Sequence, residues 1–400
     1  MKILNTSSIF RYYLFVFLKD FAFFSAVLIP FFTEWGHISL TQVTILQSWF
    51  MLWIFFLEIP TGAIADYFGR KISLVLGCII IAIASLVYGS IPKFEIFLIG
   101  EFLYAMGVAL ISGADEALLY DSLKENGKEN ESKKIFGRAH SFNLLGMLIS
   151  APIGGFIASK LGLNAPLLFS SIPFLLAGVV AFTMKEPIMH QKISESKRYF
   201  DIARAGFMYF YKHKTLRLLA IDSIMVASSA YFVIWLYQLL FKSLNIPIFY
   251  FGFGHSLLVT AEILVASNFT YFEKIFGSGK SFLNFSAIIT GISFIVVALF
   301  PSIFTVTLFI LFAGGFGITR SELMSSYMNK FIPSEKRATV LSSISMFRRF
   351  ALVIINPIIG FTADHSLGLA LLILGLLPIL VFLFSPIRQK MLDQNEDMQV

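Results

Sequence analysis

Residues 62–71 read Gly62-Ala63-Ile64-Ala65-Asp66-Tyr67-Phe68-Gly69-Arg70-Lys71. This short stretch separates two apolar runs, roughly 41–64 and 72–91, each long enough to cross the ~30 Å hydrocarbon core of a bilayer as a helix. Its glycines permit close packing and positive φ, and Asp66 can cap the next helix or pair with a basic side chain. The two basic residues at its end suit lipid headgroups. The stretch therefore predicts a tight turn at a membrane surface.

The composition of the whole chain supports a membrane setting. Of 400 residues, 57% are hydrophobic and 14% are charged, whereas about 25% of a soluble domain is charged. A soluble globular enzyme with this composition could not cover its surface with polar groups, so that class is excluded. Cys78 is the only cysteine, which also excludes a disulfide framework and a zinc site built on cysteines.

Twelve apolar stretches reach membrane-spanning length, and the loops between them are short except for a charged, polar segment at 185–214. We therefore predict an all-α integral membrane protein with twelve transmembrane helices. A six-helix bundle is expected at 1–184, a cytoplasmic linker at 185–214 and a second six-helix bundle at 215–400. The predicted spans are roughly 9–33, 41–64, 72–91, 95–120, 138–159, 165–184, 215–241, 249–272, 281–300, 303–328, 338–362 and 367–386.

The basic residues set the topology. Most of the 31 Lys and Arg residues fall in the termini, in every second loop or in the helix ends beside those loops. Only Lys93, Lys160 and Lys242 fall in the opposite loops. By the positive-inside rule, both termini and the linker are cytoplasmic. Topology thus accounts for the net charge of +7. Since no segment is long enough for a folded basic domain, we expect no nucleic-acid partner.

The two halves of the sequence resemble each other. Residues 151–158 read APIGGFIA and residues 356–363 read NPIIGFTA, so Pro, Ile, Gly, Phe and Ala recur at the same spacing. An Arg-Ala pair opens the predicted span in both halves, at 138–139 and at 337–338. This pattern indicates a duplicated six-helix unit. Because six is even, both copies start from the cytoplasmic side, and the repeats are parallel about an axis along the membrane normal.

The opening turn resembles the G-x-x-x-D-x-x-G-R-K motif of the major facilitator superfamily through Gly62, Asp66, Gly69, Arg70 and Lys71. It stands where that family has it, between the second and third spans on the cytoplasmic side. The resemblance implies the family's fold of two six-helix halves and its function, secondary transport by alternating access. In the family this motif latches the two halves together in one conformation. Taken alone, the same residues also fit an ordinary positive-inside turn.

A second resemblance lies in the fifth span, where Gly146, Pro152, Gly154 and Gly155 match an antiporter motif, G-x3-G-P-x2-G-G. In the family this motif is associated with proton-driven exporters, so the resemblance implies export. Ser150 departs from the pattern, which has Gly at that position. Small residues also allow close helix contact and Pro permits a bend, so a generic packing face is the alternative.

Charged residues inside the spans are unevenly distributed. Spans three, six, nine and twelve have none in their interiors, whereas every other span but the fifth has at least one. Charges in hydrocarbon are expensive and face a cavity or a partner, so these four spans are expected to face lipid. In the resembled family they are outer supports, and the other spans line a central cavity. The interior charged residues are Lys19, Asp20, Glu58, Glu101, Asp115, Glu116, Asp222, Glu262, Arg320, Glu322, Arg348 and Arg349.

Asp20 is the first candidate for proton coupling. At about 1.5 Å per residue it lies near the middle of the first span. Removal from water disfavours a charged carboxylate, so such a group can load and release a proton as access alternates. Asp222 and Glu262 are second candidates for this role. The alternative for Asp20 is a static ion pair with Lys19 or with a neighbouring span.

Six charged residues are candidates for a gate or for the cavity wall. Three arginines lie in the second half, and acidic residues lie near the cytoplasmic ends of spans two and four. We expect some of them to pair between the halves and to close the cytoplasmic side when the cavity faces outward. Alternatively, one arginine binds a carboxylate or phosphate of the substrate, because its guanidinium fork suits both. The candidates are Glu58, Asp115, Glu116, Arg320, Arg348 and Arg349.

The leading functional hypothesis is a secondary active transporter that exports a small organic molecule in exchange for protons. Uptake of a nutrient or organic ion, by symport or facilitated diffusion, is the first alternative. A non-transporting membrane enzyme or scaffold is the second, but the six His are scattered without metal-ligand spacing, so no metal and no cofactor are expected. The predicted partners are the substrate, protons and the lipid bilayer. We expect a monomer that spans the cell membrane several times.

Overall fold

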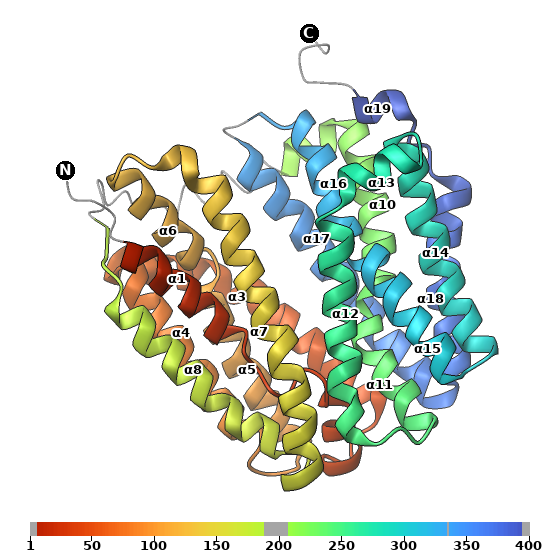
Figure 1. Cartoon of the computed structure of the whole chain (residues 1–400), viewed down its shortest axis with the longest axis horizontal. Helices are drawn as coiled ribbons and strands as arrows, with labels where there is room; N and C mark the ends of the chain where they lie inside the picture. Colours follow the sequence, from red (N-terminus) through yellow and green to blue (C-terminus); the bar gives the residue numbers. More distant parts are fainter. Residues whose placement is uncertain (1–5, 188–206, 334–335, 394–400) are drawn as a thin grey trace. The chain divides into compact units, whose positions relative to one another are not determined.

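The computed structural model describes residues 6–187, 207–333 and 336–393, and every regular element within these ranges is helical. The chain divides into two compact units, and their helices are labelled in Figure 1. The first unit takes the described residues of Met1–Lys197 and also Ile248–Ser256, and the second takes the remainder. The start of the eighth predicted span therefore belongs to the first unit.

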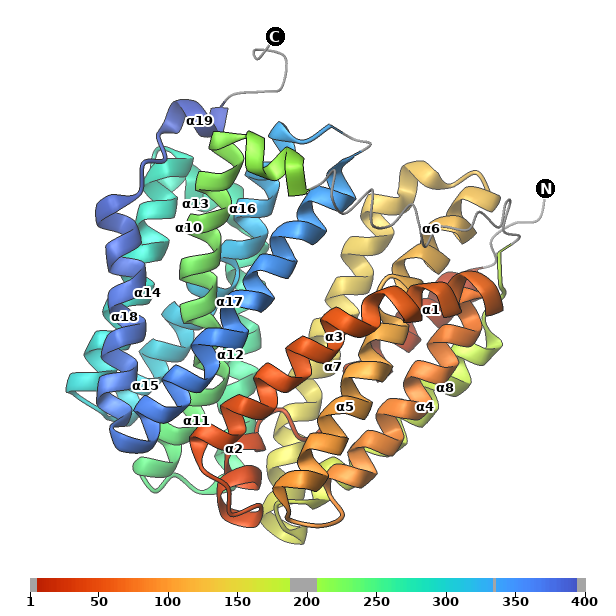
Figure 2. The same ribbon diagram turned by 180° about the vertical axis from the view of Figure 1, so that it is seen from behind.

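The first unit is a bundle in which α4 packs against both α5 and α8, and α1 packs against α7 and α8 (Figure 2). These contacts bring the first, third, fourth, fifth and sixth predicted spans together. Its elements are α1 (Thr6–Lys19), α2 (Leu28–Pro30), η1 (Phe31–Trp35), α3 (Leu40–Phe68), α4 (Arg70–Tyr88), α5 (Phe94–Ile111), α6 (Ala114–Glu125), η2 (Glu129–Glu131), α7 (Ser132–Leu161), α8 (Ala165–Thr183) and η3 (Ile248–Tyr250).

The second unit is a bundle in which α14 packs against α18, and α10 packs against α16 and α18. Helix α12 (Phe251–Ala266) begins in the first unit and continues into this one. The other elements are α10 (Lys214–Tyr231), α11 (Val233–Ser243), α13 (Phe269–Ile275), α14 (Gly279–Leu299), α15 (Ile303–Phe309), η4 (Ile310–Ile318), α16 (Arg320–Met328), η5 (Asn329–Phe331), α17 (Arg337–His365), α18 (Leu367–Phe384) and α19 (Gln389–Asp393).

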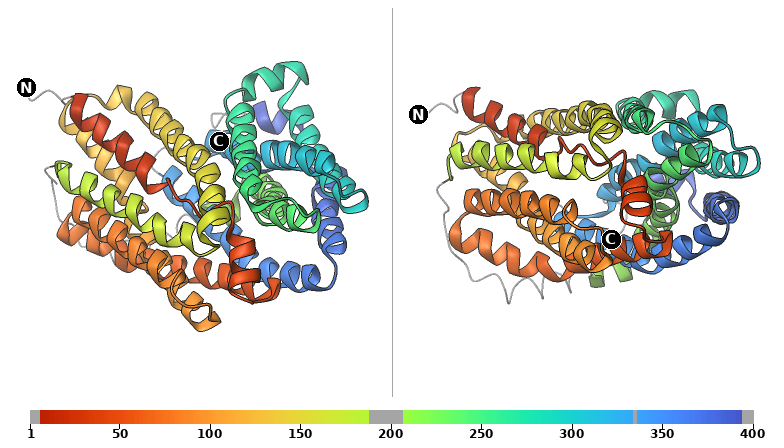
Figure 3. Two further views of the ribbon diagram at one scale, coloured as in Figure 1. Left: turned by 60° about the horizontal axis from the view of Figure 1, so that its bottom comes forward. Right: turned by 90° about the horizontal axis from the view of Figure 1, so that it is seen from below.

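Eleven helical segments among the described residues are long and apolar enough to cross a membrane, and they correspond to predicted spans two to twelve. The first predicted span, 9–33, differs from the prediction of one continuous helix. Helix α1 ends at Lys19, and helix resumes only at α2. Figure 3 shows the intervening red segment without helical turns. The length of the apolar stretch indicates a membrane-spanning segment, but it contains no signal that the helix is interrupted within that segment.

The break in the first span is stabilised by partners from other helices. The Ser170 hydroxyl of α8 accepts a hydrogen bond from the Phe23 amide at 2.9 Å. The Phe23 carbonyl lies directly over Gly154 of α7, so close that a Cβ on Gly154 would stand 1.7 Å from its oxygen. In a bilayer, non-helical backbone is tolerated only where protein or a water-filled cavity surrounds it. The Ser170 hydroxyl and the surface at Gly154 supply such surroundings.

The outer helices carry apolar stripes. The stripe on α4 consists of the exposed side chains of residues 72, 76, 79, 83 and 86, and that on α18 consists of those of residues 369, 373, 376, 380 and 383, with exposed Phe384 beside it at the helix end. Both series alternate steps of three and four residues, the spacing of one helix face. All ten side chains are Leu or Ile. Such a face suits contact with lipid.

Prolines inside two spans free carbonyl groups that serine hydroxyls then satisfy. Pro152 lacks the amide that would bond the Leu148 carbonyl, and the Ser256 hydroxyl donates to that carbonyl at 2.8 Å. In the second unit, Pro378 frees the Leu374 carbonyl in the same way, and the Ser229 hydroxyl donates to it. An unsatisfied carbonyl in hydrocarbon costs several kcal/mol. Each proline is thus tolerated through one hydroxyl on another helix.

Close approach of the first span to α7 predicts a large cost for any side chain at Gly154. We expect Gly154→Ala to destabilise the protein by roughly 1–3 kcal/mol, because backbone must move to make room. The matched control is Gly137→Ala in the same helix, where no described atom lies within 4 Å of an added Cβ. That change is expected to be neutral or stabilising by up to about 1 kcal/mol, since Ala favours helix. Thermal unfolding in detergent compares them, and equal shifts would contradict the packing argument.

Candidate functional site

Four polar side chains of the first unit form a cluster at the broken first span. The Lys19 ammonium lies 3.4 Å from a carboxylate oxygen of Asp20 and 3.5 Å from one of Asp115. The Asn143 amide of α7 donates to Asp20 at 2.6 Å. The exposed fractions of the Lys19, Asp20 and Asp115 side chains are 22%, 27% and 13%. We name Lys19, Asp20, Asp115 and Asn143 the first-unit cluster.

Helix ends position the charges of this cluster. Lys19 is the last residue of α1, where a cation is favoured, and Asp115 lies in the first turn of α6, where an anion is favoured. Consecutive side chains of a helix point in different directions, but α1 ends at Lys19, so the side chain of Asp20 is free to approach that of Lys19. Their pairing is the contact that the sequence offered as an alternative role for Asp20.

A second break creates the start of α6. Helix α5 ends at Ile111, and Gly113 has a φ of +77°, a conformation that favours glycine. The carbonyls left without helical partners accept hydrogen bonds from two other helices. The Thr61 hydroxyl donates to Ala109 at 3.1 Å, and the Ser73 hydroxyl donates to Leu110 at 2.6 Å. These bonds fix the break and hence the place of Asp115.

Sequence reasoning missed two polar partners in this unit. Asn143 was not among the candidates, although an amide in an apolar helix is a signal in itself, because it needs an interhelical partner. Glu101 was noted only as an interior charge. In the structure it is 5% exposed and accepts a hydrogen bond from the Gln47 amide at 2.9 Å. Glu116 is exposed and Glu58 is half-buried.

The turn between α3 and α4 is stabilised by a residue that lies far from it in sequence. Gly69 has a φ of +102° and is the N-cap of α4, which no side chain of the turn caps. Glu186 fills this role. Its two carboxylate oxygens accept hydrogen bonds from the Arg70 and Lys71 amides at 2.8 and 2.7 Å. The capping offered to Asp66 therefore goes to Glu186, and Asp66 is exposed.

The basic side chains of the same turn contact the unit itself. The Arg70 guanidinium pairs with Asp121 of α6 and donates to the Ala117 carbonyl at 2.6 Å. The Lys71 ammonium lies 4.7 Å from the centre of the Phe182 ring. Gly62 is exposed, and no described atom lies within 4 Å of where its Cβ would stand. Arg70 and Lys71 thus join the start of α4 to α6 and α8.

The antiporter-like motif packs backbones together. A Cβ on Gly146 would stand 2.6 Å from the Phe17 carbonyl oxygen of α1, and one on Gly155 would stand 2.7 Å from the Phe249 carbonyl oxygen of η3. With Gly154 against the broken segment, the motif places the C-terminal end of α1, the break that follows it and η3 along α7. Pro152 frees the carbonyl that Ser256 satisfies.

In the second unit, Asp222 and Arg320 form a buried ion pair. One carboxylate oxygen of Asp222 receives the Arg320 Nη2 at 2.5 Å and Nε at 3.2 Å, and the other accepts from the Ser385 hydroxyl at 2.9 Å. The remaining guanidinium nitrogen donates to the Leu283 carbonyl at 2.5 Å and to Ser286. Asp222 and Arg320 are 5% and 2% exposed. The carboxylate partner of Arg320 therefore lies in its own half.

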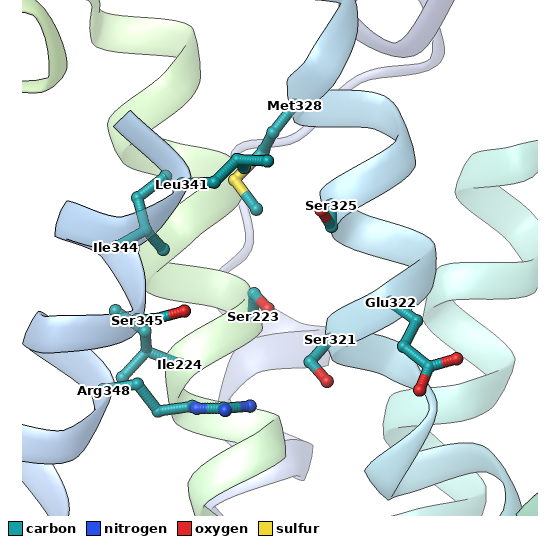
Figure 4. Close-up of a pocket in the computed structure, with 10 residues that line it drawn as sticks. All are labelled: Ser223, Ile224, Ser321, Glu322, Ser325, Met328, Leu341, Ile344, Ser345 and Arg348. Carbon is teal, nitrogen blue, oxygen red and sulfur yellow. The ribbon is translucent and has the colours of Figure 1, made fainter. Parts of the chain in front are cut away.

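A cavity of about 340 Å³ opens between three helices of the second unit. Figure 4 shows Arg348 reaching from α17 toward Ser321 of α16, with Ser223 of α10 beside it. We name this space the second-unit cavity. Arg349 is half-buried next to Arg348, and half-buried Glu262 interacts electrostatically with Glu322. The lining residues are Ser223, Ile224, Ser321, Glu322, Ser325, Met328, Leu341, Ile344, Ser345 and Arg348.

Comparison with known sequences gives a consistent answer. A sequence model described as Major Facilitator Superfamily matches residues 12–355. An uncharacterised MFS-type transporter of Methanocaldococcus jannaschii is 23% identical over 325 residues, covering 78% of this chain and 79% of that protein. Multidrug resistance protein 2 of Bacillus subtilis is 32% identical over 143 residues, 34% of each chain.

Comparison with solved structures addresses the fold. The nucleoside transporter NupG superposes with a TM-score of 0.78 at 13% identity, and the match covers 98% of this chain and 100% of that one. At this identity the likeness shows the fold alone. It confirms the predicted fold class, an all-α membrane protein of twelve helices in two parallel six-helix repeats.

The Glu186 cap generates a prediction for the start of α4. Glu186→Ala removes the acceptor of two amides and should cost about 1 kcal/mol of stability, as loss of a helix cap does. Hydrogen exchange at the Arg70 and Lys71 amides should accelerate. The control is Lys185→Ala, which breaks an exposed pair with Glu125 and should change little. Unchanged exchange in Glu186→Ala would show that the cap is not needed.

The Asp222–Arg320 pair generates a prediction for the second unit. Asp222→Leu leaves a buried guanidinium without its carboxylate and should cost roughly 3–5 kcal/mol. Adding Arg320→Met removes the stranded charge and should restore most of the stability, because an apolar pair of similar volume is close to neutral. Unfolding in detergent measures all three proteins. A double variant as unstable as the single one would contradict the ion-pair explanation.

Proposed function

Because this chain belongs to the Major Facilitator Superfamily, and is thus a multi-span membrane transporter rather than an enzyme, we propose that it exports a small organic molecule in exchange for protons. Transport proceeds by alternating access, in which the binding site opens to one side of the membrane at a time. The protein acts as a monomer in the cell membrane, with both termini in the cytoplasm.

The first-unit cluster carries this proposal. Asp20 stands at a break in a membrane span, where broken helices of transporters form ion and substrate sites. Its carboxylate is held by Lys19 at 3.4 Å and by Asn143 at 2.6 Å. When a proton neutralises Asp20, the attraction to Lys19 is lost, and Lys19 keeps only Asp115 as an acidic neighbour in the cluster. One proton thus changes the contact between α1 and α6.

Other candidates take secondary roles in this scheme. Asp222 has both carboxylate oxygens engaged, so we assign its pair with Arg320 to stability. Glu262, near Glu322, is the second candidate for a proton site. Glu58, Asp115, Glu116 and Arg349 are proposed to act in a cytoplasmic gate that closes when the site faces outward.

Two observations favour export over uptake. The Gly146–Gly155 segment is similar to the motif associated with proton-driven exporters, and it packs directly along the first span that holds Asp20. A relative carries the name Multidrug resistance protein 2. Neither observation depends on the charge of the substrate.

Transport in everted membrane vesicles tests the proposal. Radiolabelled organic acids, amines and neutral compounds are screened for accumulation when the vesicle interior is acidified. Export predicts that at least one compound accumulates and that a protonophore abolishes this. Asp20→Asn should lose accumulation yet keep exchange of labelled for unlabelled compound. The control Glu129→Gln removes an exposed acid and should behave as wild type.

Two outcomes would overturn the assignment. Accumulation that persists in Asp20→Asn with the same proton dependence would remove Asp20 from coupling. Accumulation only in right-side-out vesicles would establish uptake instead of export.

A further inference from the structure

Half-buried Arg348 differs from three other buried or half-buried cations, each of which has a carboxylate partner in its own unit. Lys19 has Asp20 and Asp115, Arg70 has Asp121, and Arg320 has Asp222. Among the described residues, none forms an ion pair or hydrogen bond with Arg348, which lies in a membrane-spanning segment and faces a cavity. A cation in a span needs a counter-charge or water. A negatively charged ligand bound in this cavity would supply the counter-charge for Arg348.

We propose that the second-unit cavity binds a small organic carboxylate, with Arg348 as the partner of its carboxylate group. This rests on the proposed function, because it names the class of molecule transported. The guanidinium fork matches the two oxygens of a carboxylate, and the hydroxyls of Ser223 on α10 and Ser345 on α17 can donate to the same group. Figure 4 shows Ser223, Ser321 and Ser345 around the guanidinium end of Arg348.

The nearest acid on α10 is not available to Arg348. Asp222 precedes the cavity-lining Ser223 in sequence, but Arg320 and Ser385 occupy its two oxygens. An internal ion pair with this residue would have to break a bond network that is almost wholly buried. Arg348 is thus left for a ligand, while Arg320 is committed to the fold.

The rest of the lining narrows the ligand class. Ile224, Met328, Leu341 and Ile344 form an apolar part of the wall, which suits the hydrocarbon portion of an organic acid. Glu322 also lines the cavity and repels a second negative charge. A monocarboxylate therefore fits better than a phosphate ester with two charges. The volume of about 340 Å³ restricts the ligand to a small molecule.

Binding to the purified full-length protein tests this without any assumption about transport. The probes are benzoate, lactate and 4-aminobutyrate, each compared with its uncharged amide, together with phenyl phosphate and benzylamine. Calorimetry and thermal unfolding in detergent report binding. We expect at least one carboxylate to bind and its amide to bind at least tenfold more weakly, because the amide cannot form the charge-assisted hydrogen bonds with the guanidinium.

Variants at two arginines of α17 assign the effect. Arg348→Gln should abolish the preference for carboxylate over amide, and Arg348→Lys should retain part of it. Arg337→Gln makes the same change at an exposed position of the helix and should bind as wild type. Wild-type preference in Arg348→Gln, tighter binding of phenyl phosphate or benzylamine, or no carboxylate binding would each overturn the inference. Should Arg348→Gln fail to fold, the carboxylate–amide comparison on wild type still decides.

The outcome is separable from that of the transport assay. Carboxylate binding that depends on Arg348, without proton-driven accumulation, supports the site and refutes proton-coupled export. Proton-driven accumulation of amines alone supports export and refutes the carboxylate site.

Discussion

The absence of water inside a bilayer is the constraint on which the structure depends. Every backbone group that a helix releases must find a partner within the protein. The break after Lys19, the break at Gly113, Pro152 and Pro378 each release such groups, and at each of these four places a hydroxyl group bonds at least one of them. The Phe23 amide donates a hydrogen bond to the Ser170 hydroxyl, and the Ser73 hydroxyl donates to the Leu110 carbonyl. Serine and threonine side chains thus make irregular backbone possible at places where a regular helix would have been simpler.

The two units handle buried charge differently. In the first, Lys19 lies 3.4 and 3.5 Å from the carboxylates of Asp20 and Asp115, and all three side chains are partly exposed, which suits the proton-coupling role that we propose for Asp20. In the second, Asp222 and Arg320 are almost fully enclosed and saturated with hydrogen bonds. Burying a saturated pair contributes little net stability, but removing one partner is costly. The partly exposed cluster and the enclosed pair therefore suit the different roles that we propose for them.

Sequence predicted the fold well and the site less well. Length and apolarity located eleven of the spans, because the length and hydropathy of an apolar stretch can be read from consecutive residues. The motif at Gly62–Lys71 was placed at its turn, but its cap was not, since Glu186 lies far along the chain. The break after Lys19 depends on Ser170 and Gly154, which no local pattern could connect to it. The sequence showed which residue types were present, but it did not show which distant residues they contact.

The link between Pro152 and Ser256 has a consequence for variation among related chains. The hydroxyl serves a carbonyl that is vacant only because a proline stands four residues later. Losing the serine alone strands that carbonyl, and losing the proline alone restores its amide partner and makes the hydroxyl redundant. Substitutions at these two positions, more than a hundred residues apart, should consequently be correlated among related chains, with the proline replaced before the serine.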